Sequence, residues 1–587
     1  MMPTSEIRAA STANLQAIVE LAAQLAQVRA EPLRFADVPA LAQSWADPAG
    51  FQSALLEHHA RSVPMPKSAG GHGYDLYHDA VLRHSQSGGI ALHAYDRRTG
   101  WQLLRYAELH ALCSRLAVQW AQAGMMPGKT ICLLQPMGVE LLVELCTAFR
   151  LGLRVSLLPP VGAAYVLRRL RALAPDYTVL DPAYQALISA APEVAGRLVR
   201  SEPVGLIGAR WQGSHTYDPA APALALFSPL REPSGTASEL SAALCYGGAL
   251  RDALLVLGLQ PGAILSAPAA PLLVHQPLLL MTALLSGATY VHIETAALRA
   301  DPSLLEVQPV DILAVSCALR DLLRGLRKRL RRPRFWFHDP FDDGNEAAWR
   351  QFVDVQGLEA VPMCFLRYDA SSGGTVLLSG RIKKRALPLL LPAPGVATTL
   401  KSVVPYGQPL AGAVGVLITP QDSAGELLLI RHQDAYLCGG TRTLRRAGLV
   451  YPATEVVELI GRLPYVQGSA VVALPATEAS RQGEFILVIF TGAELPAQTR
   501  ALEPARTQEL QALIARQLGE DYLPDVCAYF PLYPRSAGQG IDPGWVRKQY
   551  LSGALHRRRQ RRIFQVLTAL QQACQPLARK ASGAPLA

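Results

Sequence analysis

The hydrophobic positions between residues 106 and 158 follow two alternating periods. Apolar residues recur three and four positions apart over 106–123 and 138–149, which predicts two amphipathic helices. A short and continuously apolar run follows each helix, at 130–134 and at 154–158, with the length of a buried strand. Helices that alternate with buried strands predict a parallel sheet covered by helices, and therefore an α/β fold.

Composition favours a well-packed globular protein, because 50% of the residues are hydrophobic and 17% are charged. The formal net charge of +10 is concentrated in basic clusters at 324–334 and 556–562. Such clusters are typical of solvated helix faces, and neither a zinc-ligand spacing nor an aromatic RNA-binding signature accompanies them. Binding to nucleic acid or to an anionic membrane therefore stays a minor alternative.

Cysteine usage and the terminal segment bear on the compartment. The nine cysteines are scattered singly, which argues against a disulfide framework or a structural metal. The N-terminus lacks the basic start and continuous apolar core of a signal peptide. The most apolar region, 267–291, is interrupted by prolines and predicts buried core elements, with no transmembrane segment. We expect a cytoplasmic protein.

The order of certain residues in the C-terminal part of the chain resembles that of a known protein family. The C-terminal stretch 531–553 reads PLYPRSAGQGIDPGWVRKQYLSG and keeps Gly538, Ile541, Asp542, Arg547 and Tyr550 in order. Upstream of it lie Gly448, Pro452, Glu455, Glu458, Pro464 and Val466. This order resembles the adenylate-forming superfamily, which includes acyl-CoA synthetases, fatty acyl-AMP ligases, adenylation domains of peptide synthetases, and luciferases.

The resemblance implies how the 587 residues are divided. We expect a helical N-terminal extension and linker over 1–75, with the glycine-rich linker at 68–75. A large AMP-binding-like domain of helix-flanked sheets would span 76–437. A small α+β lid-like domain would span 438–553, and a basic helical tail 554–587.

The phosphate-binding loop of the superfamily falls at 233–241 by this resemblance. Three residues match the family pattern: Ser234, Gly235 and Thr236. Ser241 stands where the family has a lysine, and Glu239 adds a negative charge that repels phosphate. The loop therefore predicts weakened nucleotide binding.

The resemblance also gives Tyr368 the role of stacking on adenine. The other residues that match this nucleotide-binding motif are Asp369, Ser371 and Ser372. Ser372 replaces the family's glutamate, which helps to hold Mg²⁺, and Mg²⁺ requires hard anionic oxygen ligands. His275 falls where family members have a histidine near the acyl pocket, although a lone histidine in an apolar helix is more often a core residue. Both interpretations of His275 stay open.

The catalytic lysine of the closing motif is missing, because Gln539 or Gly540 occupies its position. The segment 436–448 is also too short to hold both the ribose-binding acid and the interdomain hinge of the family. We therefore assign no catalytic residue and no metal ligand.

These losses predict a pseudoenzyme that acts as a binding or partner protein in fatty acid, polyketide or peptide-type acyl metabolism. Its expected partner is an acyl or peptidyl carrier protein or a sister biosynthetic enzyme. The alternative is an active, ATP- and Mg²⁺-dependent carboxylic acid ligase of the acyl-AMP or acyl-CoA type. In that case the lost lysine would be replaced by Arg547, Lys548 or an arginine at 442, 445 or 446.

Overall fold

The computed structural model describes most of the chain and divides it into two compact units. The described residues are 44, 47–62, 66–68, 72–201, 207–227, 237–268, 270, 272–306, 308–323, 329–339, 346–370, 373–378, 391–396, 399–400, 415–418, 427–432, 435–439, 444–446, 449–474, 484–492, 496–532, 536–537 and 540–561. The first unit comprises Met1–Pro160 and Val166–Val450, and the second comprises Val161–Tyr165 and Tyr451–Ala587.

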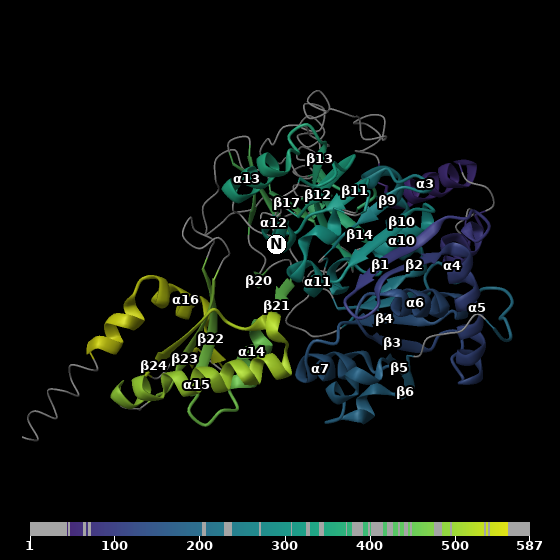
Figure 1. Cartoon of the computed structure of the whole chain (residues 1–587). Helices are drawn as coiled ribbons and strands as arrows, with labels where there is room; N and C mark the ends of the chain where they lie inside the picture. The colour runs from purple at the N-terminus through teal and green to yellow at the C-terminus, as the bar shows by residue number, and fades with distance from the viewer. Residues whose placement is uncertain are drawn as a thin grey trace, which may run out of the picture. The chain divides into compact units, whose positions relative to one another are not determined.

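The larger sheet of the first unit has nine strands in the order β15-β14-β13-β12-β11-β9-β10-β1-β2 (Figure 1). The six strands from β13 to β1 run parallel, and β2, β14 and β15 pair antiparallel at the two edges. The strands are β1 Ile90–Asp96, β2 Gly100–Arg105, β9 Ile264–Ser266, β10 Thr289–Ile293, β11 Ile312–Ala314, β12 Phe335–His338, β13 Met363–Asp369, β14 Gly374–Leu378 and β15 Leu391–Pro392.

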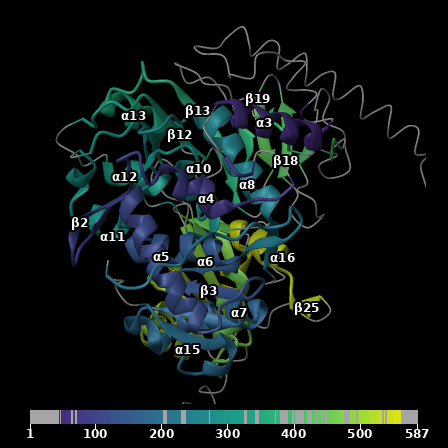
Figure 2. The same ribbon diagram turned by 90° about the vertical axis from the view of Figure 1, so that its right-hand side faces the viewer.

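The second sheet of this unit has six strands in the order β6-β5-β3-β4-β7-β8, of which only β8 is antiparallel. They are β3 Thr130–Leu134, β4 Arg154–Leu158, β5 Tyr177–Leu180, β6 Arg197–Arg200, β7 Pro222–Leu226 and β8 Ser238–Ser241. The two predicted helices are α5 (Tyr106–Gln122) and α6 (Val139–Leu151), which pack against each other (Figure 2). Helix α6 lies against β3 and β4, and α5 against β1 and β2. The predicted α/β pattern is confirmed, and β3 and β4 have the predicted bounds.

The most apolar region forms buried core elements, as predicted. Helix α10 (Leu278–Leu285) has all eight of its residues buried, which explains why it has no polar face. None of the helices in the described part of the chain combines the length and the apolar composition that crossing a bilayer requires. The other helices of this unit are α3 Pro48–Ser62, α4 Leu76–Ala80, α8 Ala242–Arg251, α9 Leu272–His275, α11 Thr295–Ala300, α12 Cys317–Leu323 and α13 Glu346–Gln356. Helix α7 (Ala163–Leu173) also belongs to it except for its first three residues, which are assigned to the second unit.

The N-terminal helix α3 packs against α8 in the first unit. Leu55 and Leu56 join the main hydrophobic core, and the Gln52 amide donates a hydrogen bond to the carbonyl oxygen of Ala243 (2.8 Å). In the stretch predicted as a linker, Ser68 and Asp75 are buried, and the Asp75 N–H donates to the Ser68 hydroxyl (3.1 Å). Part of the N-terminal extension thus belongs to the core of the large unit.

A cluster of ionisable side chains lies between α3 and the segment after α4. Burial, followed by the charge of Arg83, lowers the pKa of His59 from 6.5 to about 4, and the same two causes lower the pKa of His84 to about 4. Arg83 Nη1 lies 3.3 Å from His59 Nε2, and Arg83 Nη2 donates to the carbonyl oxygen of Leu285 (2.6 Å). Asp79 opposes both shifts without reversing them.

These histidines predict a loss of stability in mild acid. Below about pH 6.5 the unfolded chain takes up a proton at each histidine, whereas the folded chain does so only near pH 4. The free energy of unfolding contributed by this cluster therefore falls as the pH drops from about 6.5 to 4. Urea denaturation at half-unit pH steps is expected to show a shallower decline in His59→Gln than in the wild type.

The difference between the two proteins is the quantity to compare. Burial raises the pKa of Glu144 from 4.5 to about 8, which changes stability in the opposite direction over part of this range. That contribution is present in both proteins and cancels in the difference. Parallel curves for wild type and His59→Gln would exclude the assignment of the acid sensitivity to His59.

The second unit contains a three-stranded sheet in the order β22-β23-β24 with helices α14, α15 and α16. Its elements are β22 Gly468–Leu474, β23 Glu484–Phe490, β24 Val526–Phe530, α14 Ala453–Ile460, α15 Pro496–Gln517 and α16 Pro543–Leu551. The short strands elsewhere are β16 Thr399–Leu400, β17 Gly415–Ile418, β18 Leu427–His432, β19 Ala435–Gly439, β20 Leu444–Arg446, β21 Leu449–Tyr451, β25 Ser536–Ala537 and β26 Gly540–Ile541. The predicted tail helix beyond 561 lies outside the described residues.

Candidate functional site

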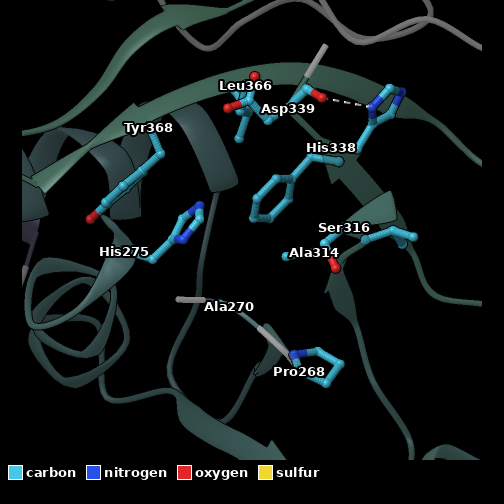
Figure 3. A pocket seen from close by; sticks show the side chains of 11 residues that line it. Pro268, Ala270, His275, Ala314, Ser316, His338, Asp339, Leu366 and Tyr368 are labelled. Atoms are coloured by element: carbon cyan, nitrogen blue, oxygen red, sulfur yellow. Dashed lines mark hydrogen bonds between the residues drawn. The ribbon is translucent and has the colours of Figure 1, made fainter. Parts of the chain in front are cut away.

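A pocket of the first unit lies at the carboxyl ends of neighbouring parallel strands (Figure 3). Ala314 ends β11, and Ser316 follows it by two residues. His338 ends β12 and Asp339 follows directly, while Tyr368 is the last residue but one of β13. Parallel α/β sheets bind their ligands at this edge. The pocket is lined by Pro268, Ala270, His275, Ala314, Val315, Ser316, Phe337, His338, Asp339, Leu366 and Tyr368.

Two residues that the sequence assigned to different subsites meet in this pocket. The imidazole of His275, at the end of α9, stacks on the ring of Tyr368 with a centroid distance of 5.3 Å and an interplanar angle of 25° (Figure 3). One face of the Tyr368 ring is therefore covered by His275. The sequence had placed Tyr368 with the nucleotide, and His275 either near the acyl pocket or in the core.

Tyr368 is also enclosed as a whole, with 5% of its surface exposed. Burial, followed by the nearby charge of Asp252, raises the pKa of the Tyr368 hydroxyl well above its ordinary value. The side chain is thus neutral at physiological pH. A purine needs an open ring face for stacking, and the arrangement of His275 and Tyr368 does not offer one on the side that His275 covers.

The polar wall of the pocket is formed by the end of β12. The Asp339 carboxylate accepts a hydrogen bond from the buried guanidinium of Arg367 at 2.5 Å, and this contact is also an ion pair. His338 stacks on Trp349 with a centroid distance of 3.9 Å, and its Nδ1 lies 3.3 Å from the Asp339 carbonyl oxygen (Figure 3). These polar groups are held in place by an ion pair and by aromatic packing.

The described lining of this pocket lacks the positive charge that magnesium-ATP requires. Adenylation requires positive charge and backbone donors beside the carboxylate and the phosphates. Among the described residues that line the pocket, none is a lysine or an arginine, and Asp339 adds a negative charge. In the described part of the chain, no group of three histidine, cysteine or acidic side chains is arranged to hold a metal ion.

Several predicted site residues cannot be placed in this geometry. Those outside the described residues are Ser234, Gly235, Thr236, Ser371, Ser372, Arg442 and Gln539. Asp369 is the last residue of β13, and Gly540 begins the two-residue strand β26. Arg445 and Arg446 belong to β20, and Arg547 and Lys548 lie on α16.

Three residues of the family motifs, two that depart from the pattern and one that keeps it, have structural roles. Ser241, at the lysine position, caps the N-terminus of α8, where its hydroxyl accepts a hydrogen bond from the Leu244 N–H (3.3 Å). Glu239 forms an ion pair with Arg154 of β4. Asp542 of the closing motif caps α16 by accepting from the Gly544 N–H (2.9 Å). The described remains of these motifs therefore serve the fold.

The hairpin that follows Tyr368 is fixed to α8 by a buried polar contact. Asp252 Oδ2 accepts hydrogen bonds from the Thr375 N–H (2.8 Å) and the Thr375 hydroxyl (3.0 Å). Arg251 donates from Nε to Asp252 Oδ1 (2.9 Å) and from Nη2 to the Thr375 carbonyl oxygen (2.8 Å). We call Arg251, Asp252 and Thr375 the hairpin clamp.

Sequence reasoning missed the polar wall of the pocket. Asp339, Arg367 and Ser316 match no family motif in the sequence, and their proximity depends on strand order. A signal for Asp339 was nevertheless present, because it directly follows the buried aromatic strand Phe335–His338. A polar residue immediately after a buried strand lies at the edge of the sheet where ligands bind.

Comparisons with known proteins agree with the fold. No family model and no curated protein sequence matches the chain. The solved structure of a double mutant of o-succinylbenzoate CoA synthetase (MenE) from Bacillus subtilis, bound with a product analogue, is 15% identical with a TM-score of 0.59, covering 80% of this chain and 98% of its own. The amide bond synthetase McbA from Marinactinospora thermotolerans is 16% identical with a TM-score of 0.63, covering 81% and 99%. The chain has the fold of the adenylate-forming enzymes.

Proposed function

We propose that this chain is a catalytically impaired protein with the adenylate-forming fold, which acts by binding rather than by ligation. It would serve fatty acid, polyketide or peptide-type acyl metabolism, together with a carrier protein or a sister biosynthetic enzyme. The observation that supports this most directly is the burial of Tyr368 against His275. This contact covers one of the two ring faces on which adenine could stack.

Independent sequence changes support the same proposal. Ser241 replaces the lysine of the phosphate loop, Ser372 replaces the glutamate that helps to hold Mg²⁺, and Gln539 or Gly540 stands at the position of the catalytic lysine. Removing one preorganised group at a transition state costs about 10²–10³ in rate. Each replacement removes charge from the same reaction, so their effects point in one direction.

Magnesium-ATP is expected to leave the melting temperature unchanged at millimolar concentration and to support no ATP–pyrophosphate exchange with carboxylic acids. A ligand at 100 times its Kd would stabilise the folded chain by about 2.7 kcal/mol, which differential scanning fluorimetry detects. Magnesium alone and ATP with a chelator are the controls. Exchange above the enzyme-free rate, or a rise in melting temperature specific to magnesium-ATP, would contradict the proposal.

Whether His275 blocks adenine stacking on Tyr368 can be tested separately with adenosine, which has no phosphates. His275→Ala removes the ring that covers Tyr368, so adenosine is expected to bind this variant more tightly than the wild type. Equal affinity for the two proteins would show that His275 does not block purine stacking.

The second candidate is an active carboxylic acid ligase, and the synthetase names of the two structures described above favour it. In such a protein ATP would supply the adenylate, and Mg²⁺ would neutralise phosphate charge. Native mass spectrometry of the protein isolated from its host separates the candidates further. Under the binding proposal we expect a bound acid or a protein partner, without bound adenylate.

A further inference from the structure

The net positive charge of the protein is concentrated in its C-terminal segment. Residues 543–587 contain nine lysine and arginine residues and no aspartate or glutamate. The whole chain has 56 basic and 46 acidic residues, which leaves 47 basic and 46 acidic residues over 1–542. The chain before 543 is therefore nearly neutral, and nine of the ten net charges belong to this one segment.

The described part of the segment consists of two consecutive helices that are packed into the second unit. Helix α16 is followed by a turn at Gly553, which has φ +68°, and then by a helical stretch over 554–561. Leu555 is fully buried in a hydrophobic core of this unit. The His556 ring packs edge-on against Phe530 with a centroid distance of 5.2 Å. The backbone that carries the charges is thus part of a packed structure.

Arg559 marks the face of the second helix that is turned toward the unit. Its Nη2 forms an ion pair with Glu503 of α15 (2.8 Å), and its Nη1 donates a hydrogen bond to the Tyr529 carbonyl oxygen (3.1 Å). Leu555 lies one helical turn before Arg559, so these two residues share the inward face. The other arginines of the stretch are exposed on other faces.

We call the exposed cations of the two helices, together with one leucine of α16, the basic surface. Its members are Arg547, Lys548, Leu551, Arg557, Arg558 and Arg561. Within the ranges that the structure describes, none of its five cations forms an ion pair with an acidic side chain. Arg561 follows Arg557 and Arg558 by four and three residues, a spacing at which like charges on a helix repel. The basic surface therefore lacks a counter-charge of its own and favours an anionic partner.

The turn brings the charges of the two helices together. A Cβ atom at Gly553 would lie 3.2 Å from Arg557 Nη1, so this guanidinium reaches back over the turn toward the end of α16. Leu551, the last residue of α16, is 49% exposed. It follows Arg547 and Lys548 by four and three residues and therefore shares their face of the helix. An exposed aliphatic side chain thus lies among the cations.

This combination suits a lipid surface better than nucleic acid. Aliphatic side chains beside lysine and arginine enter the boundary between the headgroups and the acyl chains of a membrane. Proteins that bind single-stranded nucleic acid stack its bases on aromatic rings. The aromatic rings next to the basic surface, Phe530, Tyr550 and His556, pack on one another instead, with centroids 5.2–6.3 Å apart.

We infer that the basic surface binds the anionic headgroups of a lipid membrane, with Leu551 entering the interface. The basic surface belongs to the second unit and the candidate pocket to the first. The inference therefore goes beyond the proposed function and does not depend on it. It requires no chemical step.

Sedimentation of the full chain with lipid vesicles tests the inference. We expect binding to phosphatidylcholine vesicles that contain about one-third phosphatidylglycerol, and at least about a hundredfold weaker binding to phosphatidylcholine alone, because each cation contributes about fivefold at an anionic surface. Binding should weaken as the salt concentration rises from about 0.05 to about 0.5 M, since salt screens exposed charges. Equal binding to the two kinds of vesicle, or no binding to either at low salt, would overturn the inference.

Substitutions locate the binding surface. The double variant Arg557→Gln with Arg561→Gln is expected to bind anionic vesicles about 25-fold more weakly, and the corresponding lysine variant to bind like the wild type. Leu551→Ser should weaken binding about fivefold. Arg331→Gln with Arg332→Gln is the matched control, because it removes two exposed arginines from the first unit. Binding of the Arg557 and Arg561 glutamine variant at the wild-type level, with the control also unchanged, would exclude this surface.

Other anionic partners are tested with the same proteins. Single-stranded RNA and polyglutamate stand for nucleic acid and for an acidic protein, and thermal unfolding confirms that each variant is folded. The inference is overturned if the Arg557 and Arg561 glutamine variant loses binding to RNA or to polyglutamate but still sediments with anionic vesicles like the wild type. In that case the basic surface would belong to that other partner.

Discussion

Alanine at position 248 is expected to destabilise the large unit by about 3 kcal/mol, because the helix and the hairpin after Tyr368 touch at their backbones. A Cβ atom at Gly248 of α8 would lie 1.7 Å from the carbonyl oxygen of Gly373. No side-chain rotation relieves a clash with a backbone atom, so the hairpin must move. The movement would strain the hairpin clamp at Thr375.

The neighbouring glycine provides the matched control. A Cβ atom at Gly247 would meet the terminal amide of Gln52 at 2.5 Å, and this flexible side chain can move away. Alanine also favours the helix by up to about 1 kcal/mol relative to glycine. Gly247→Ala is therefore expected to cost much less than Gly248→Ala.

Urea denaturation followed by tryptophan fluorescence measures both variants. Six of the seven tryptophans precede Val450, so the signal reports mainly on the large unit. Equal denaturation midpoints for Gly247→Ala and Gly248→Ala would show that the hairpin can separate from α8 at little cost.

The second large effect is expected from Asp252→Ala, with a loss of about 3–5 kcal/mol in the free energy of unfolding. The Asp252 side chain is 1% exposed and the Arg251 side chain 7% exposed. Removing the carboxylate takes away the ion-pair partner of Arg251 and the acceptor of the Thr375 N–H and hydroxyl. A buried charge that loses its partner is far more costly than an absent ion pair.

Three variants together separate the contribution of the Asp252 charge to stability from that of its hydrogen bonds. Thr375→Val removes only the hydroxyl bond and should cost about 1 kcal/mol. Asp252→Asn retains an acceptor for the Thr375 N–H without the charge, and its cost should fall between those of Thr375→Val and Asp252→Ala. If all three variants unfold at the wild-type urea concentration, the hairpin clamp contributes nothing to stability.

The spacing of apolar residues predicted much of the fold, because the buried face of each helix or strand produces a regular apolar pattern in the sequence. The helices α5 and α6 and the strands β3 and β4 were predictable, since each presents a regular apolar pattern to one shared core. The buried helix α10 was predictable as a core element from composition alone. The strand order of the nine-stranded sheet was not predictable. Strand β9 pairs with β11 and β10 pairs with β1, and no local sequence pattern encodes these long-range contacts.

The candidate site was likewise predictable only in part from the sequence. The sequence alone determined that Ser241, Ser372 and either Gln539 or Gly540 lack the chemistry of the family pattern, because a residue type is fixed wherever the chain folds. It also singled out His275 and Tyr368 as site residues. Only the tertiary structure decided that these two rings stack on one another, and that Asp339, held by Arg367, lines the pocket beside them. Side chains from separate strands meet only when parallel strands align their carboxyl ends, and that alignment is set by the sheet as a whole.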